Sequence, residues 1–386
     1  MRIVIAPSWY TTKADPLGTD GSFHYDLAKE LSKDHDVSVF YPFDRSLTDD
    51  FSESTERGLL VYRSRFVPGE RVRNRIRIYR AFKKMVQKFR PDIVHTHVAT
   101  EAGRYMALWC SVFRIPFIVT EHSTVEVSGV EKGLAHLYAG FVYKRSLRNY
   151  CVSEDLQHKL SVIFPNMRFR VIYNGIITPD EIQETAKTSD YRRNRAGYHI
   201  ALVAALYDEK IKGLQYLFRA VRMLKDQEQS GGGMQPVALH VVGGGDYQQY
   251  FEKMAKDMEI EDHVIFYGMC DKPEVYDIVS QMDFLVSASL VESFGCSMAE
   301  ALLLGKPVLA TRCGGPEGFV TSQVGRLVEK GSAQALYEGI LEMIRCLDSF
   351  ESEKIRQYAY ERFDNRVISK KYEGVYQKVL ESRQGD

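Results

Sequence analysis

Two glutamates eight positions apart, Glu292 and Glu300, enclose a polar turn and the start of an apolar helix. A strand is predicted at residues 284–286, before the turn, and the helix at residues 297–304. The first N–H groups of a helix lack helical acceptors and attract anions, whereas carboxylates accept hydrogen bonds from hydroxyls. The segment therefore predicts a site for a phosphate beside a ribose or hexose, built on Glu292, Glu300 and the helix start, which comprises Phe294, Gly295, Cys296 and Ser297.

Further candidates follow other predicted strands. Lys212 stands in Ile211-Lys212-Gly213, after a strand at residues 200–206, and its compact charge suits a leaving group that gains negative charge. Taken alone, such a lysine is more often a solvated surface residue. Glycine turns that permit close backbone approach follow strands at 239–242 and 264–267, and another precedes the first helix; they contain Gly244, Gly268 and Gly21.

Histidines follow two strands of the first half. His122 comes after a strand at residues 117–120, where a neutral imidazole could hydrogen-bond a hydroxyl, the alternative being a packed core histidine. His95 and His97 lie on the preceding strand. We expect only one of them to face a ligand and interpret both as structural.

Short apolar runs alternate with amphipathic segments along the whole chain. This alternation predicts parallel sheets covered by helices on both faces, in an α/β chain of two doubly wound Rossmann-like domains. We expect one domain at 1–175 and the other at 176–369, with a last helix at 370–386 packing back on the first. Ligands are expected at the carboxyl ends of the strands, in a cleft across which the domains face one another.

The motif of Glu292 and Glu300 resembles the Glu-x7-Glu motif of glycosyltransferase family 4, and the resemblance covers nearly the whole chain. It implies a GT-B fold and retaining transfer of a hexose-type sugar from a nucleotide diphosphate, without a metal or other cofactor. It also implies that Glu292 and His122 lie near the donor sugar, that Glu300 binds the ribose, and that Lys212 neutralises the diphosphate. Gly21, Gly244 and Gly268 match family loops near the donor.

The chain departs from this pattern upstream of Lys212. The family usually carries an arginine there, but this chain has Ala204-Ala205-Leu206, so Lys210 is a candidate for the second charge. Two alternatives remain open: a nucleotide-sugar 2-epimerase, and a non-catalytic subunit that binds nucleotide sugars. The expected acceptor is a glycan or a lipid-linked molecule, in bacterial surface polysaccharide or glycolipid synthesis.

Composition narrows the class of protein further. The formal net charge is zero, although residues 1–178 carry 26 basic and 19 acidic side chains, and no nucleic-acid partner is expected. Scattered cysteines and the absence of an apolar leader favour the cytoplasm.

Between residues 63 and 90, eleven basic residues accompany one acid, which predicts either peripheral contact with an anionic membrane or a solvated helix face. Asp34-His35-Asp36 is interpreted as a structural turn rather than a metal site.

Overall fold

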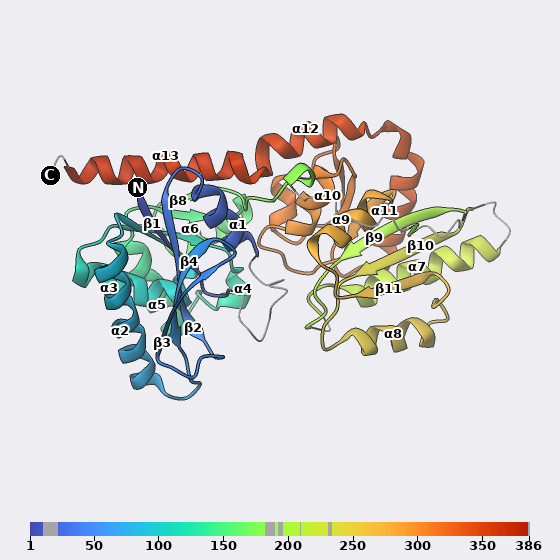
Figure 1. Ribbon diagram of the computed structural model, residues 1–386. Coiled ribbons are helices and arrows are strands. Elements are labelled where there is room, and N and C mark those ends of the chain that lie inside the picture. Colours follow the sequence, from blue (N-terminus) through green and yellow to red (C-terminus); the bar gives the residue numbers. More distant parts are fainter. Residues whose placement is uncertain (11–21, 182–189, 192–195, 209, 231–233, 385–386) are drawn as a thin grey trace. The chain divides into compact units, whose positions relative to one another are not determined.

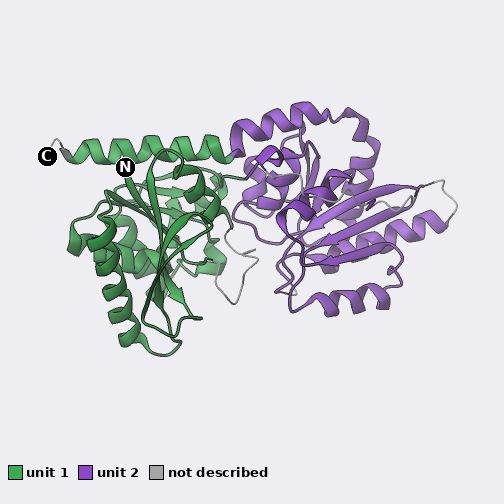
Figure 2. Ribbon diagram, viewed as in Figure 1, with its two compact units in different colours: residues 1–176, 365–386 green, residues 177–364 purple. Residues whose placement is uncertain are grey.

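The computed structural model describes residues 1–10, 22–181, 190–191, 196–208, 210–230 and 234–384 (Figure 1). The chain divides into two compact units, shown in Figure 2. Unit 1 comprises Met1–Ile176 and Asn365–Asp386, and unit 2 comprises Ile177–Asp364. Each unit contains one sheet of mainly parallel strands with helices packed against it, so the predicted class of two Rossmann-like α/β units is confirmed.

The sheet of unit 1 has eight strands in the order β3-β4-β2-β1-β5-β6-β7-β8. The strands are β1 (Arg2–Ala6), β2 (Asp36–Asp44), β3 (Phe51–Glu56), β4 (Leu59–Arg65), β5 (Ile93–His97), β6 (Phe117–Glu121), β7 (Asn149–Cys151) and β8 (Phe169–Val171). Only β3 runs antiparallel to its neighbour among these pairings. The strand order reverses between β1 and β5, so the loops that follow these two strands diverge at this point of the carboxyl edge.

The helices of unit 1 include one from the far end of the chain. They are α1 (Ser22–Leu31), α2 (Arg71–Phe89), α3 (Arg104–Phe113), α4 (Val125–Ser128), α5 (Gly133–Arg145), α6 (Glu154–Ile163) and α13 (Asn365–Gln384), with a π-helical turn at Val98–Gly103. Two buried tyrosines anchor α13 to the sheet. Tyr376 Oη lies 2.8 Å from His95 Nδ1, and Tyr372 Oη lies 3.1 Å from Thr120 Oγ1. The C-terminal helix is therefore part of the unit 1 core.

The β3–β4 hairpin of unit 1 was not predicted from the sequence. The buried guanidinium of Arg63 on β4 joins it to the rest of the sheet, because it contacts Asp44 Oδ2 at 2.9 Å and Glu56 Oε2 at 2.6 Å. Both carboxylates are needed, since an unpaired buried charge is costly. The first basic residue of the 63–90 stretch therefore serves the core of unit 1.

Most of the remaining basic stretch forms α2. The apolar residues Ile78, Phe82 and Met85 are buried, so the apolar stripe of α2 faces the sheet. The basic side chains occupy the outer face, where Arg77 pairs with Glu70 and Asp50. Val72 and Ile76 are exposed beside these basic side chains, at 72% and 45%, so contact of α2 with a membrane stays a prediction. Within the described residues, no helix has the length and apolar character needed to cross a membrane.

The sheet of unit 2 has six strands, all parallel, in the order β11-β10-β9-β12-β13-β14. They are β9 (Tyr198–Val203), β10 (Val237–Val242), β11 (Val264–Gly268), β12 (Phe284–Ser287), β13 (Val308–Thr311) and β14 (Gly325–Val328). The helices are α7 (Leu214–Gln229), α8 (Gln248–Asp257), α9 (Lys272–Ser280), α10 (Cys296–Leu303), α11 (Ala333–Arg345) and α12 (Ser352–Phe363). The strand order reverses between β9 and β12, which is where ligands bind in open parallel sheets.

Candidate active site

Lys212 and Glu292 meet at the switch point of unit 2. Lys212 lies in the loop after β9, and Glu292 lies in the loop after β12. Lys212 Nζ is 2.6 Å from Glu292 Oε1, with both side chains mostly but not fully buried. Two residues singled out from the sequence, eighty positions apart, therefore form one charged pair at the edge of the sheet where ligand binding is expected.

Local hydrogen bonds hold the Lys212 loop against the end of β12. The carboxylate of Asp208 accepts from the backbone N–H groups of Lys210 and Ile211 at 2.6 and 2.8 Å, and the N–H of Leu290 donates to the Ile211 carbonyl at 2.7 Å. Gly213 has a φ of +66°, and a Cβ built there would lie 2.0 Å from the Ala288 carbonyl oxygen. Only glycine fits this contact, which explains the Lys-Gly pair.

Glu292 is fixed through both its backbone and its side chain. Its N–H donates to the Cys313 carbonyl at 3.1 Å, and its carbonyl accepts from Gly315 N–H at 2.9 Å. Ser289 Oγ donates to Glu292 Oε1 at 2.9 Å, the same oxygen that Lys212 contacts. The contacts from Lys212 and Ser289 both use Oε1, and a carboxylate can accept further hydrogen bonds through its second oxygen.

The residues predicted to start the helix do so. Gly295 is the N-cap of α10, which begins at Cys296, with Ser297 next. Phe294 contributes only its backbone to this turn, because its ring is buried against Phe319 and Phe363. The aromatic contacts fix the turn, so the start of α10 presents its first N–H groups at the same loop as Glu292.

Glu300 lies one turn further along α10 and pairs with Lys272, a residue that the sequence analysis did not identify. Lys272 Nζ hydrogen-bonds Glu300 Oε1, and Lys272 begins α9, after the Gly268 turn. The Glu300 side chain is only 13% exposed, so a partner for its charge is needed. A Lys-Pro pair at a helix start carries no signal that it will face a glutamate 28 positions away.

The turns that contain Gly244 and Gly268 are joined to each other. Gly243 N–H donates to the Gly268 carbonyl at 2.9 Å, and Leu206 N–H donates to the Gly244 carbonyl at 2.9 Å. These glycines therefore pack the loops after β9, β10 and β11 closely together. Their observed contacts are with backbone, and a ligand contact by Gly244 or Gly268 stays a prediction.

Lys330 is a second basic residue near the Glu292 loop. It follows β14, and its Nζ donates to the carbonyl of Leu290 at 3.2 Å. Burial raises the pKa of the Cys313 thiol to about 12, and the charges of Lys330 and Lys212 both act to lower it, so both cations lie in the surroundings of this thiol. Lys330 is therefore a candidate for the charge that the upstream arginine supplies in other members of the family that the motif resembles. Sequence reasoning missed it because it lies beyond the motif, on another strand.

The charge of Lys212 is secured by its partner. Burial alone would lower the pKa of Lys212, but the facing Glu292 carboxylate outweighs burial and raises that pKa above its usual value. Lys212 is accordingly a cation throughout the neutral range. The site thus combines a fixed positive charge, a helix start and two carboxylates, which together suit a phosphorylated ligand with hydroxyl groups.

Comparison with known proteins identifies the family. The family model described as glycosyl transferases group 1 matches residues 188–362, and the one described as Glycosyltransferase Family 4 matches residues 21–178. The chain belongs to glycosyltransferase family 4. The protein is a glycosyltransferase, and the recognition made from Glu292 and Glu300 is confirmed.

Three similar proteins illustrate the breadth of this family. The N-acetyl-alpha-D-glucosaminyl L-malate synthase of Bacillus anthracis is 27% identical over 77% of each chain. The alpha-monoglucosyldiacylglycerol synthase of Streptococcus pneumoniae is 28% identical over 88% of this chain and 79% of that protein. The crystal structure of Anabaena HepE in complex with UDP-glucose has a TM-score of 0.73 at 18% identity and covers 100% of both chains. These likenesses support the GT-B fold class.

The glycosyltransferase carries its candidate histidine in unit 1. His122, directly after β6, is 7% exposed, and burial lowers its pKa to about 3, an effect that neighbouring Asn174 partly offsets. His122 is therefore neutral at physiological pH. Its contact with a donor sugar stays a prediction. Gly21 lies outside the described residues.

That only one of His95 and His97 faces a ligand stays a prediction, although the two side chains do not alternate between the faces of β5. Residues two apart on a strand lie on the same side of it, and the two rings are 4.3 Å apart between centroids. His95 is structural, because its ring nitrogens contact Tyr376 and Thr120. His97 has a different environment, among other histidines.

Proposed function

We propose that this glycosyltransferase transfers a hexose-type sugar from a nucleoside diphosphate with retention of anomeric configuration. The observation that carries the proposal is the Lys212–Glu292 pair beside the start of α10, at the switch point of unit 2. The complex of the similar protein HepE with UDP-glucose adds support for a nucleotide sugar donor.

In this proposal Lys212 and the first N–H groups of α10 stabilise the diphosphate as the glycosidic bond breaks. Charge that develops on a leaving group is stabilised most by donors that are already in position. Lys212 has only to move from Glu292 to a phosphate oxygen, and the released carboxylate of Glu292 can then accept a hydrogen bond from a sugar hydroxyl. Glu300 is proposed to accept from the ribose hydroxyls after a comparable release from Lys272.

No bound metal is required in this proposal. Lys212, Lys330 and the helix start supply positive charge where a divalent cation serves in other phosphate sites. We assign no carboxylate nucleophile and therefore propose attack by the acceptor on the face that the diphosphate leaves, with the diphosphate accepting the proton of the attacking hydroxyl.

The test begins with a thermal-shift screen against UDP-, GDP-, ADP- and dTDP-sugars in the presence of EDTA. One nucleotide class is expected to stabilise the protein and to be slowly hydrolysed. Lys212→Ala should lower kcat by roughly 10²–10³-fold, as when one transition-state donor is removed. The matched control is Lys225→Ala, because Lys225 is also ion-paired in unit 2 but on α7, with Asp262.

The outcomes of this screen separate the alternatives. Interconversion of the nucleotide sugar without an acceptor would indicate an epimerase. Binding without any turnover, on every acceptor class offered, would indicate a non-catalytic subunit. Failure of all four nucleotides to stabilise the protein, or equal activity of Lys212→Ala and the control, would contradict the donor site. NMR of the product's anomeric proton decides between retention and inversion.

We further propose a lipid-linked or membrane-borne acceptor, with α5 rather than residues 63–90 as the membrane contact. One face of α5 exposes Leu134, Leu137, Tyr138 and Phe141, with exposures of 69%, 64%, 41% and 36%. The opposite face of the same helix is also apolar and is buried through Ala139, Val142 and Tyr143. When a surface helix is apolar on both faces, its outer face is expected to be covered by a binding partner while the protein functions.

Charge indicates what covers this face. Lys132 precedes α5, and Lys144, Arg145 and Arg148 lie at its other end, all exposed. Apolar side chains flanked by basic ones fit an anionic bilayer, into which leucine and aromatic rings insert while lysine and arginine meet the headgroups. The name of the Streptococcus pneumoniae relative, a diacylglycerol-lipid synthase, adds support for a lipid acceptor.

Vesicle sedimentation tests the α5 face. Binding to vesicles that contain phosphatidylglycerol is expected to weaken roughly tenfold or more in Leu137→Glu, which loses apolar contact and adds repulsion. Val162→Glu is the control, because Val162 is 67% exposed on α6, outside this face. Equal binding by both variants, or binding to neutral vesicles alone, would contradict the proposal.

A further inference from the structure

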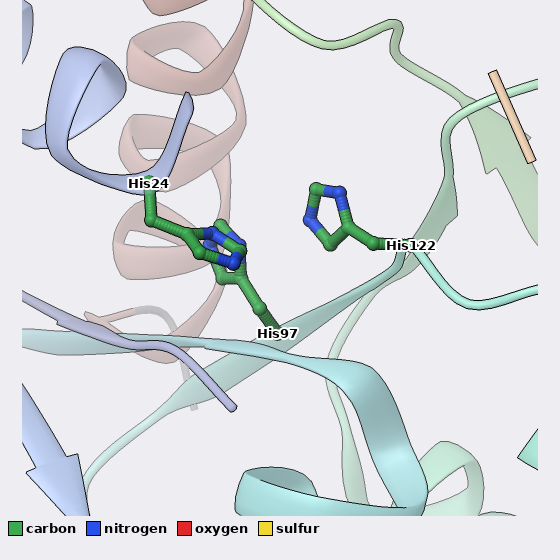
Figure 3. A group of neighbouring side chains, drawn as sticks. All are labelled: His24, His97 and His122. Atoms are coloured by element: carbon green, nitrogen blue, oxygen red, sulfur yellow. The ribbon is translucent and has the colours of Figure 1, made fainter. Parts of the chain in front are cut away.

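The chain turns at the end of β5, beside the buried side chains of His24 and His122 (Figure 3). His97 is the last residue of β5, and its ring is nearly parallel to that of His122, with centroids 4.7 Å apart. The π-helical turn Val98–Gly103 follows directly and leads into α3. The turn therefore starts at the carboxyl edge of the unit 1 sheet, next to the histidine that is predicted to contact the donor sugar.

Val98 holds a strained backbone conformation in this turn. Its φ is +67°, in the left-handed region that a β-branched residue rarely adopts, and its side chain is fully buried. The turn also requires Gly103, because a Cβ there would lie 2.9 Å from the Val98 carbonyl oxygen. Strained residues and π-helical turns occur most often at functional sites, where the surrounding protein holds them in place.

Two buried polar side chains hold the turn from neighbouring strands. Glu121, at the end of β6, accepts from Ala99 N–H at 3.0 Å through Oε2. Ser8, in the loop after β1, accepts from Ala102 N–H at 3.1 Å and donates to the His97 carbonyl. Both anchoring side chains are almost fully buried. The turn is therefore fixed near both of its ends, and so is the residue that follows it.

That residue is Arg104, which is half-buried and has no acidic partner. Its Nη2 donates to the Tyr105 hydroxyl over a long 3.4 Å, and its buried Nε has no hydrogen-bond partner. No carboxylate in the described part of the chain lies within ion-pair distance of Arg104. Burial raises the pKa of the neighbouring Glu101 carboxyl, and the charge of Arg104 lowers it less. A partly buried guanidinium without such a partner is expected to receive acceptors from a ligand.

Two tyrosine rings flank the guanidinium of Arg104. Its Cζ lies 4.9 Å from the ring centroid of Tyr105 on α3 and 5.5 Å from that of Tyr138 on α5. Tyr138 belongs to the exposed apolar face of α5, the proposed membrane contact. Arg104 therefore lies at the edge of that face, where an amphiphilic molecule would place its headgroup.

We propose that Arg104 binds a phosphate group on the acceptor and so selects a phosphorylated, lipid-linked acceptor. A guanidinium presents its N–H donors in a planar fork that matches the oxygens of a phosphate, whereas a neutral headgroup offers no charge to pair with it. Phosphate is favoured over carboxylate because the lipids of an anionic bilayer carry it at the surface that faces α5. The inference rests on the proposed transfer function and names the acceptor class for it.

Titration with octyl phosphate, below its micelle concentration, tests this inference without a donor or any transfer. The full-length protein is expected to bind octyl phosphate roughly tenfold more tightly than octyl glucoside, which has the same chain but no charge. Arg104→Gln should lose roughly tenfold or more in affinity for octyl phosphate, and Arg104→Lys should keep part of that affinity. Arg114→Gln is the matched control, because Arg114 is exposed at the other end of α3.

Two further ligands separate the possible sources of the phosphate. Glycerol 3-phosphate is expected to bind more weakly than octyl phosphate, because it lacks the alkyl chain. Equal affinity for the two would indicate a small phosphorylated molecule and overturn the lipid-linked acceptor. Octanoate should also bind more weakly, and equal binding of octanoate would overturn the assignment to phosphate. Equal affinity of the wild-type protein for octyl phosphate and octyl glucoside would overturn the inference whether or not the variants fold.

The variants separate this site from the donor site. Lys212→Ala should bind octyl phosphate as the wild-type protein does, because Lys212 lies in unit 2. Loss of binding in that variant, or equal affinity of Arg104→Gln and Arg114→Gln, would overturn the inference. Arg104→Gln should keep its stabilisation by nucleotide sugars. Failure of the nucleotide-sugar screen and failure of the octyl phosphate titration are therefore distinct results.

Discussion

At the residue scale, the chemistry of the site depends on pairs that no single motif contains. Glu292 and Glu300 were identified from their spacing, but their partners Lys212 and Lys272 come from the loops after β9 and β11. A sequence motif reports residues that share one loop and helix. Contacts between loops depend on which strands are neighbours in the sheet. A single sequence does not reveal that strand order.

Lys330 gives a prediction at this scale. Lys330→Ala should weaken binding of the nucleoside diphosphate roughly fivefold, because an exposed charge contact contributes about 1 kcal/mol. Isothermal titration with the diphosphate measures the effect. Lys354→Ala is the control, because Lys354 pairs with Glu351 near the start of α12 and has no contact with the Leu290 loop. An unchanged affinity in Lys330→Ala would remove this residue from the site.

At the element scale, the regular strands and helices were predictable and the edge hairpin was not. Apolar runs such as those of β1, β5 and β6 are fully buried, so composition alone marks them. Phe51–Glu56 reads Phe-Ser-Glu-Ser-Thr-Glu, is mostly polar and pairs on one side only, as β3 at the sheet edge. Its stability comes from β4 and Arg63, which local sequence does not reveal.

The Arg63 network makes the stability of this hairpin depend on pH. Burial would raise the pKa of Glu56, but the hydrogen bonds from Arg63 and Ser54 outweigh it and hold that pKa below the usual 4.5. A depressed carboxyl pKa stabilises the fold above the unfolded-state pKa, and this stabilisation is lost as pH falls through the folded-state value.

Glu56→Gln should therefore lower the free energy of unfolding by about 1–2 kcal/mol at pH 7. The deficit should shrink as pH falls below 4.5, where the wild-type carboxyl also becomes protonated. Urea unfolding at several pH values measures both. If the loss of stability in Glu56→Gln were the same at every pH, it would come from altered packing rather than from the lost carboxylate charge.

The Lys212 loop gives a second prediction for an element. Gly213→Ala forces a Cβ to within 2.0 Å of the Ala288 carbonyl and should displace the loop from β12. Gly331→Ala shares the left-handed backbone, with a φ of +72°, but its Cβ would meet nothing closer than 3.9 Å. We expect Gly331→Ala to cost about 1–2 kcal/mol of stability and Gly213→Ala to cost clearly more and to weaken donor binding. Chemical unfolding and calorimetric titration check the two effects; equal losses would refute the packing argument.

At the scale of the whole molecule, the two units differ in how the chain builds them. Unit 2 is one continuous segment, Ile177–Asp364, whereas unit 1 needs both ends of the chain. Sequence patterns showed the succession of strands and helices for each unit. They could not show that Tyr372 and Tyr376 pack against β5 and β6, because these contacts join positions 252 and 281 residues apart.

Tyr376→Ala should therefore destabilise unit 1 selectively. Removing a fully buried aromatic ring costs about 3–5 kcal/mol, and the substitution also leaves His95 Nδ1 without its partner. Hydrogen exchange should accelerate in β1, β5 and β6 while β9 and β12 keep their protection. Uniform acceleration in both sheets would show that the units unfold together.

The place of α13 also bears on how the protein is made. During synthesis residues 1–176 leave the ribosome well before α13, the helix that covers part of their sheet. Ile177–Asp364 is complete before then and can fold as a continuous segment. Unit 1 begins to emerge before unit 2 but is thus completed after it, and until α13 emerges its uncovered strands are a surface for chaperones to protect.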